Sequence, residues 1–280
     1  MTTVLAVTDV LPLTCTRLGT CCHNKQVWLN PWELASLAQA RGLTSGEFRE
    51  RFTDQGIRLR FAGACSQYDS SRGCSAHPGR PLACRLYPLG REKRGSTVRY
   101  VHEGRQFPCL AGCPTVVELP RLSVGDYLAG QGVVPGEIAQ DVYVDMAQDL
   151  AEGAFVVLFE SGLAQRRGAE VLERWRKAIA ADSLQREALI GQSWLDLLTV
   201  PSLTADLADP AAWIAEHRAA FQATAQTSFG SLRDEHNLAD ASVRFFALAL
   251  HLLQAVGGEP AAPGHQWLAS ARHRLSSASA

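Results

Sequence analysis

The spacing of apolar residues divides the chain into an irregular first half and a helical second half. Ile138, Val142, Met146 and Leu150 recur every four residues, which is typical of one face of a helix. The stretch Leu238–Val256 carries a wide apolar face and predicts a buried central helix. Further helices are expected over residues 171–179, over residues 184–198 and from Pro210 through Phe221.

The first half contains two clear helix starts. Residues 30–33 read Asn-Pro-Trp-Glu, which combines an N-cap residue, a proline at the first helical position and a glutamate in the first turn. A helix is therefore predicted from Pro31 to about Arg41. Thr44 and Glu47 repeat the capping pattern and predict a second, shorter helix.

Only short strands are predicted in the same half. Apolar and basic residues alternate over 57–61, and residues 98–101 form a second candidate strand. Glycine, proline and cysteine interrupt the segment from Gly63 to Pro120 so often that long regular elements are not expected there. Such a segment builds a weak apolar core, and a bound metal would supply folding free energy that packing cannot.

A run of glycine and proline between residues 130 and 135 breaks any regular pattern and predicts a boundary. We expect two modules, a cysteine-rich module over residues 1–130 and a helical module over residues 131–280. The predicted fold class is mainly α: an irregular Cys-rich metal-binding module with short helices and minor β structure, followed by an α-helical module.

Composition excludes several functional classes. The formal net charge is −1, so we expect neither a nucleic-acid partner nor a membrane surface. The first dozen residues carry no lysine or arginine and only a short apolar run, so no secretory signal is predicted and a cytoplasmic location is expected. Dinucleotide-binding, Walker and nucleophile-elbow motifs are not found.

All eight cysteines fall in the first 113 residues: Cys15, Cys21, Cys22, Cys65, Cys74, Cys84, Cys109 and Cys113. Disulfides are rare in a reducing cytosol, which makes a disulfide framework the minority interpretation. Thiolates are soft ligands that suit zinc, copper(I) and iron–sulfur clusters. The spacings match neither a zinc ribbon nor a ferredoxin, so the residues alone predict a metal or cluster site without identifying which kind it is.

Two separated segments resemble the cysteine-cluster family, whose members are described as zinc- or iron-chelating. Residues 15–22 resemble its opening pattern C-x2-C-x2-C-C, with Leu18 where many members carry the second cysteine. Residues 74–88 resemble its second pattern, C-x2-(Y/H)-x2-R-P-x2-C-R-x-(Y/F)-P, and Cys65 matches the thiol expected ahead of it. The resemblance covers about residues 13–115.

The resemblance implies a ligand set drawn from the eight cysteines. Six are supported by the two patterns, and Cys109 and Cys113 are candidates for the missing ligands. The cofactor expected is an iron–sulfur cluster, with 4Fe–4S as the first choice, or zinc. Because both options use thiolate ligands, the sequence does not separate them.

The function expected is that of a cytosolic metal-binding protein with a redox or accessory role. Two alternatives are kept. One is a protein-lysine N-methylase-like enzyme, because flagellin lysine N-methylases carry a similar cysteine pattern. The other is a zinc-stabilised interaction module that binds an unidentified protein partner without catalysis. Whether the chain is an enzyme is left open.

Several other side chains are weighed against structural roles. Arg80 and Arg85 flank Cys84, where they could offset thiolate charge or bond loop carbonyls. His23 and His77 are expected to be polar turn residues, and His251 a core histidine with satisfied hydrogen bonds. Acidic residues spaced by four are expected to form a solvated helix face rather than a metal site. They are Asp141, Asp145 and Asp149.

Overall fold

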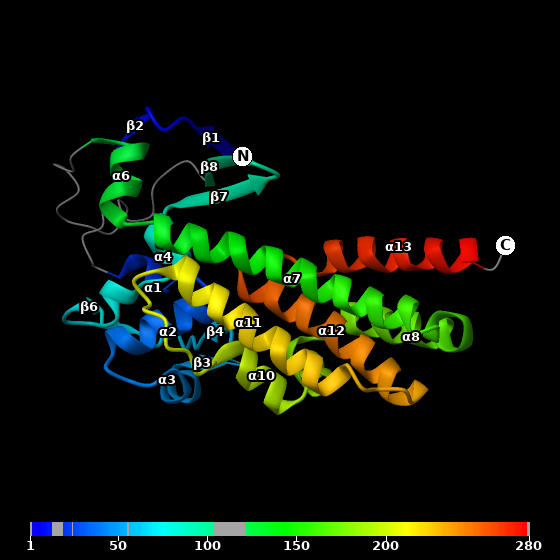
Figure 1. Ribbon diagram of the computed structural model, residues 1–280. Helices are drawn as coiled ribbons and strands as arrows, with labels where there is room; N and C mark the ends of the chain where they lie inside the picture. Colours follow the sequence, from blue (N-terminus) through cyan, green and yellow to red (C-terminus); the bar gives the residue numbers. More distant parts are fainter. Residues whose placement is uncertain (1, 13–18, 24, 55, 104–120, 279–280) are drawn as a thin grey trace. The chain divides into compact units, whose positions relative to one another are not determined.

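The computed structural model describes residues 2–12, 19–23, 25–54, 56–103 and 121–278. The chain forms two compact units (Figure 1). The first consists of Met1–Val27, Ala35–Asp54 and Arg58–Glu137, and the second of Trp28–Leu34, Gln55–Ile57 and Ile138–Ala280. Helices dominate, and the described strands belong to the first unit, which confirms the mainly α fold class.

The strands of the first unit are short and antiparallel. The largest sheet has the order β1 (Thr2–Leu5), β8 (Thr97–Glu103) and β7 (Leu89–Arg94), and Val101 of β8 lies opposite both Val4 and Gly90. The remaining strands form pairs of two residues each: β2 (Val10–Leu11) with β9 (Leu122–Ser123), β3 (Thr53–Asp54) with β4 (Arg58–Leu59), and β5 (Tyr68–Asp69) with β6 (Gly73–Cys74). The strand expected over 98–101 is confirmed within β8, whereas the one expected over 57–61 is limited to β4.

The helices of the first half begin where the capping patterns predict. In α2 (Pro31–Ala40), Asn30 Oδ1 accepts from the Glu33 N–H at 2.9 Å and Glu33 Oε2 accepts from the Asn30 N–H at 3.1 Å. The same reciprocal pair joins Thr44 and Glu47 at the start of α3 (Ser45–Phe52). The first unit also contains α1 (Thr20–His23), the 3₁₀ helix η1 (His77–Gly79), α4 (Leu82–Leu86) and α6 (Val124–Gln131).

One apolar cluster of the first unit lies around α4. Its buried residues are Leu82, Leu86, Leu89, Val124, Tyr127, Leu128 and Val133. Val27, Leu37, Phe48 and Leu59 of the same unit are buried as well. The Tyr127 hydroxyl donates to the Tyr87 carbonyl at 2.5 Å, so the core also fixes the chain just after α4. This cluster anchors the helix that presents Cys84.

The second unit is built from long helices. They are most of α7 (Val134–Glu160), α8 (Leu163–Ala180), α9 (Ser183–Ile190), α10 (Gln192–Thr199), α11 (Pro210–Phe229), α12 (Glu235–Ala255) and α13 (Ala261–Ala278). The single helix expected over 184–198 is wrong: Gly191, with φ of 87°, separates α9 from α10. A left-handed φ ends a helix, and glycine adopts it without a steric penalty.

Helix α12 is the centre of this unit, as its apolar pattern predicts. Phe246 stacks on Trp175 of α8 with ring centroids 4.4 Å apart, and Ser242 Oγ donates to the Ala154 carbonyl of α7 at 3.0 Å. Among the described residues, α12 is the one helix long and apolar enough to cross a membrane, but 83% of its most apolar window is buried inside the protein. A central core helix passes the same test of length and composition.

Two histidines are fully buried in the second unit. The Tyr143 hydroxyl donates to His217 Nδ1 at 2.9 Å, and His217 Nε2–H donates to the Leu197 carbonyl at 2.9 Å. His251 lies in the core as predicted, but neither ring nitrogen forms a hydrogen bond with a described residue. The expectation that its hydrogen bonds are satisfied is therefore wrong.

Candidate metal centre

The first pair of cysteines lies on the short helix α1. The Cys22 N–H donates to the Gly19 carbonyl at 2.7 Å, which closes the turn. Gly19 has φ of 76°, and a Cβ there would lie 2.2 Å from the ring of Tyr68. Glycine is therefore required for the close approach of Tyr68 to the α1 segment.

Cys65 and Cys74 are brought to α1 by backbone pairing. The Cys65 N–H donates to the Cys22 carbonyl at 2.8 Å. Tyr68, whose ring lies over Gly19, pairs with Cys74 in the β5–β6 hairpin. The turn of this hairpin is closed by Asp69, whose carboxylate accepts from the Ser71 and Arg72 N–H groups at 2.9 and 3.0 Å. Thiols 43 or more positions apart thus lie in adjoining segments.

Cys84 is presented by α4, and the residues around it fix that helix. The Cys84 N–H donates to the Pro81 carbonyl at 2.9 Å. Arg85 donates to the carbonyls of Arg80, Gln131 and Pro78, at 2.8, 2.8 and 2.6 Å. The loop-bonding role considered for Arg85 is therefore observed.

Arg80 combines the two roles considered for it. Its guanidinium donates to the His77 carbonyl at 3.1 Å and to Gln131 Oε1 at 3.0 Å. Its charge also helps to lower the pKa of Cys21. Hydrogen bonds therefore hold a cation at the thiol site.

The five described thiols lie in one electrostatic neighbourhood. A hydrogen bond from Cys22 lowers the pKa of Cys21 to about 6 and raises that of Cys22. Burial raises the pKa of Cys65. Burial, together with negative charge on Cys21, Cys65 and Cys74, raises the pKa of Cys84 to about 12, although the charge of Lys25 acts in the opposite direction. The site holds one thiolate readily at neutral pH, and a bound cation is needed to hold more.

Lys25 provides a fixed cation beside these thiols. Its ammonium group donates to the Ala83 carbonyl at 2.5 Å and lies 5.1 Å from the centre of the Tyr87 ring. Burial lowers the pKa of Lys25, while the adjacent Cys84 and Cys21 thiols raise it. A lysine held against the residue before Cys84 joins α4 to the α1 segment and offsets thiolate charge.

Three of the predicted ligands, Cys15, Cys109 and Cys113, lie outside the described residues, as does Leu18. None of the five described cysteines is in a disulfide bond. Within the described ranges, no three His, Cys, Asp or Glu side chains are arranged so that they could hold a metal ion. The predicted ligand set is thus brought together in part, and its full membership stays a prediction.

The other polar candidates occupy structural positions. His23 Nδ1 lies 3.3 Å from the Gly63 carbonyl, and His77 begins η1. Asp149 forms an ion pair with Arg218, and Asp145 is exposed on α7. These positions fit the turn and solvated-face roles expected of them.

Three residues of this site were missed from the sequence: Lys25, Gly19 and Tyr68. Lys25 lies three positions after Cys22, where a lysine reads as an ordinary surface residue. Gly19 and Tyr68 contact each other across 49 positions, and no local pattern indicates such a contact. A cation close to an adjacent pair of thiols is the one signal that the sequence offered.

Thiols gathered on short helices and hairpins, with basic residues around them, provide the soft donors that suit zinc or iron. Residues 14–101 match the CxxCxxCC family, described as a "putative zinc- or iron-chelating domain". The matched segment contains all five described thiols together with Lys25 and Arg80. No curated protein and no solved structure matches this chain.

Proposed function

We propose that the first unit binds an iron–sulfur cluster, with zinc as the second choice, through its clustered cysteine thiolates in a redox or accessory role. The observation that carries the proposal is the gathering of thiols from three separate segments around a half-buried lysine, Lys25. Soft thiolate donors fit both groups. A bound cluster would supply electron transfer, and zinc would supply folding free energy.

The chain's own residues prepare this site in two ways. Cys21 is a thiolate near neutral pH, so it offers a first ligand without prior loss of a proton. Lys25 and Arg80 lower the cost of further negative charge, because they are cations held by carbonyl groups of the same site. Each added ligand releases a proton on binding.

The deciding experiment is metal and acid-labile sulfide analysis of protein purified without oxygen. Stoichiometric iron and sulfide with visible absorption would support the cluster. Colourless protein with stoichiometric zinc would replace it with the zinc site. Protein with neither metal, whose stability does not respond to added iron or zinc, would refute metal binding.

Single substitutions test the ligand set. Cys21→Ser and Cys84→Ser are expected to lower both metal content and folding stability, whereas Cys113→Ser is expected to keep both. Unchanged metal content in all three variants would show that the proposed ligands are wrong. The methylase alternative stays a prediction, which a methyl-transfer assay tests with Cys22→Ser as the inactive variant.

A further inference from the structure

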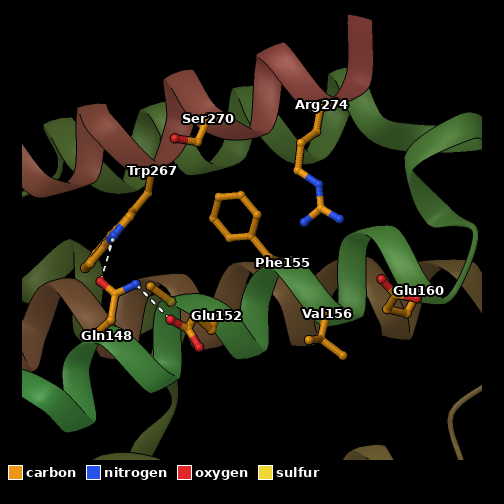
Figure 2. Close-up of a pocket in the computed structure, with 9 residues that line it drawn as sticks. Gln148, Glu152, Phe155, Val156, Glu160, Trp267, Ser270 and Arg274 are labelled. Carbon is orange, nitrogen blue, oxygen red and sulfur yellow. Dashed lines mark hydrogen bonds between the residues drawn. The ribbon is translucent and has the colours of Figure 1, made fainter. Parts of the chain in front are cut away.

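A groove lies between α7 and α13 of the second unit, where Trp267 and Arg274 of α13 face Phe155 of α7 (Figure 2). It has a volume of about 370 Å³. That volume lies within the range of small-molecule sites, which is roughly 300–1,000 Å³. The residues that line the groove all belong to the second unit.

The groove has a rigid aromatic lining. Phe155 packs against Trp175 of the core with ring centroids 5.3 Å apart, and Trp267 meets Phe246 edge to face at 6.0 Å. Both lining rings are half-buried, so each keeps an uncovered side. Val156 continues the apolar surface at the rim, where it is 57% exposed. Such a surface favours a flat or branched apolar body.

The Trp267 end of the groove presents an oriented carboxylate. The Trp267 indole N–H donates to Gln148 Oε1 at 3.1 Å, and Gln148 Nε2–H donates to Glu152 Oε1 at 3.1 Å (Figure 2). This chain fixes the tryptophan ring and Glu152 together. The second carboxylate oxygen of Glu152 remains able to accept a hydrogen bond from a ligand.

The opposite end presents a guanidinium group. Arg274 lies with its charge 4.6 Å from the centre of the Phe159 ring, and it forms no hydrogen bond or ion pair with any described residue. Glu160 lines the same groove without pairing with it. Figure 2 shows the guanidinium directed into the space beside Phe155. Its unused donors match a carboxylate, which arginine binds through two parallel hydrogen bonds.

We propose that this groove binds a small amphipathic carboxylic acid. Its carboxylate pairs with Arg274, its apolar body lies across Phe155 and against Trp267, and a hydrogen-bond donor at its far end meets Glu152. Trp267 and Arg274 are seven positions apart on one helix, so the ligand spans about 10 Å. Glu152 and Glu160 disfavour ligands with more than one negative charge.

A free organic acid and the C-terminus of a short peptide share this chemistry. Two probes separate the sources: para-aminophenylbutyrate, which carries a carboxylate, an aromatic body and a terminal N–H donor, and the tripeptide glycyl-glycyl-phenylalanine. Calorimetric titration of the full-length protein measures both. Binding of either probe supports the site. The probe that binds more tightly identifies the source of the carboxylate, a free organic acid or a peptide C-terminus.

The charge of the ligand is tested with matched compounds. The carboxamide of each probe is expected to bind at least about tenfold more weakly than the acid, because it lacks a charge-assisted pair with Arg274. The result that overturns the proposal is an amide or amine analogue that binds as tightly as the acid. Absence of binding by both acids overturns it as well.

The guanidinium is tested with matched variants. Arg274→Gln is expected to remove the advantage of the acid over its amide, whereas Arg272→Gln, an exposed arginine on the same helix, is expected to leave it unchanged. Because both side chains are exposed, both variants are expected to fold, and circular dichroism checks this. Equal acid binding by wild type and Arg274→Gln refutes the assignment.

Discussion

Mild acid is expected to destabilise the helical unit through its two buried histidines. Burial lowers the pKa of His217 to about 4. Burial, together with the positive charge of Arg186, lowers the pKa of His251 to about 3. Both rings are therefore neutral when folded and take up a proton on unfolding. Stability is complete above about pH 6.5 and falls as the pH drops toward these folded pKa values.

The size of the effect follows from these pKa values. At about pH 5 the unfolded state holds nearly one proton at each histidine and the folded state almost none, whereas at about pH 7 both states are mostly neutral. Each site then costs about 2 kcal/mol, or about 4 kcal/mol for both. Native domains are stable by only about 5–15 kcal/mol, so this loss is large enough to measure.

Tryptophan fluorescence during urea unfolding is a suitable assay, because all six tryptophans belong to the second unit: Trp28, Trp32, Trp175, Trp194, Trp213 and Trp267. The free energy of unfolding is measured at both pH values. The unfolding transition that tryptophan fluorescence reports is then that of the helical unit and not that of the cysteine site.

Substitutions assign the loss to each histidine. His251→Leu removes two buried nitrogens that lack described partners, so it is expected to keep or raise stability at neutral pH and to remove about 2 kcal/mol of the acid loss. His217→Gln breaks the bonds to Tyr143 and Leu197, so it costs stability at neutral pH but removes a similar share of the pH dependence. His265→Gln, an exposed histidine on α13, is the control. A double variant that still loses as much stability as wild type between these pH values would refute the reasoning.

Three further outcomes concern the first unit. Lys25→Met is expected to weaken metal binding about tenfold in a chelator competition, with Lys25→Arg closer to wild type, since a change of one pKa unit at one thiol is tenfold in affinity. Gly79→Ala would place a Cβ 2.3 Å from the Ser36 carbonyl oxygen, so it is expected to cost about 1–3 kcal/mol and lower metal content, whereas Gly46→Ala meets nothing within 4 Å and serves as the control. Chelation is expected to increase hydrogen exchange around α4 and leave the tryptophan transition unchanged. Equal competition curves for wild type and Lys25→Met would contradict the first outcome, and equal metal content in wild type and Gly79→Ala the second. Equal exchange rates with and without the chelator would contradict the third.

The sequence predicted what local chemistry determines. The starts of α2 and α3 followed from Asn30 with Glu33 and from Thr44 with Glu47, because a capping box is complete within four residues. Helix α13 was not predicted, and Pro263 and Gly264 near its start are residue types that usually interrupt a helix. In the structure, a Cβ on Gly264 would lie 2.9 Å from Ile179 and Leu250, so this glycine permits close packing of three helices. The formation of α13 therefore depends on packing between helices, which no local sequence pattern indicates.

The same division holds at the cysteine site. The sequence predicts which thiols belong to the site, because cysteines are gathered in one half of the chain, and that ligand set stays a prediction. The contacts that bring them together could not be predicted, because each joins positions far apart: Cys22 to Cys65, Gly19 to Tyr68, and Lys25 to Ala83. Backbone hydrogen bonds, a close ring approach and a lysine are the contacts that connect these segments.

The two units therefore depend on different sources of stability. The helical unit buries stacked aromatic rings and tolerates a histidine without hydrogen-bond partners among the described residues, because apolar burial around α12 offsets that cost. The cysteine unit has a three-stranded sheet, strand pairs of two residues and irregular loops, and the ordering of these loops costs conformational entropy. Metal binding by its thiols would offset part of that cost, so the site would then stabilise the fold.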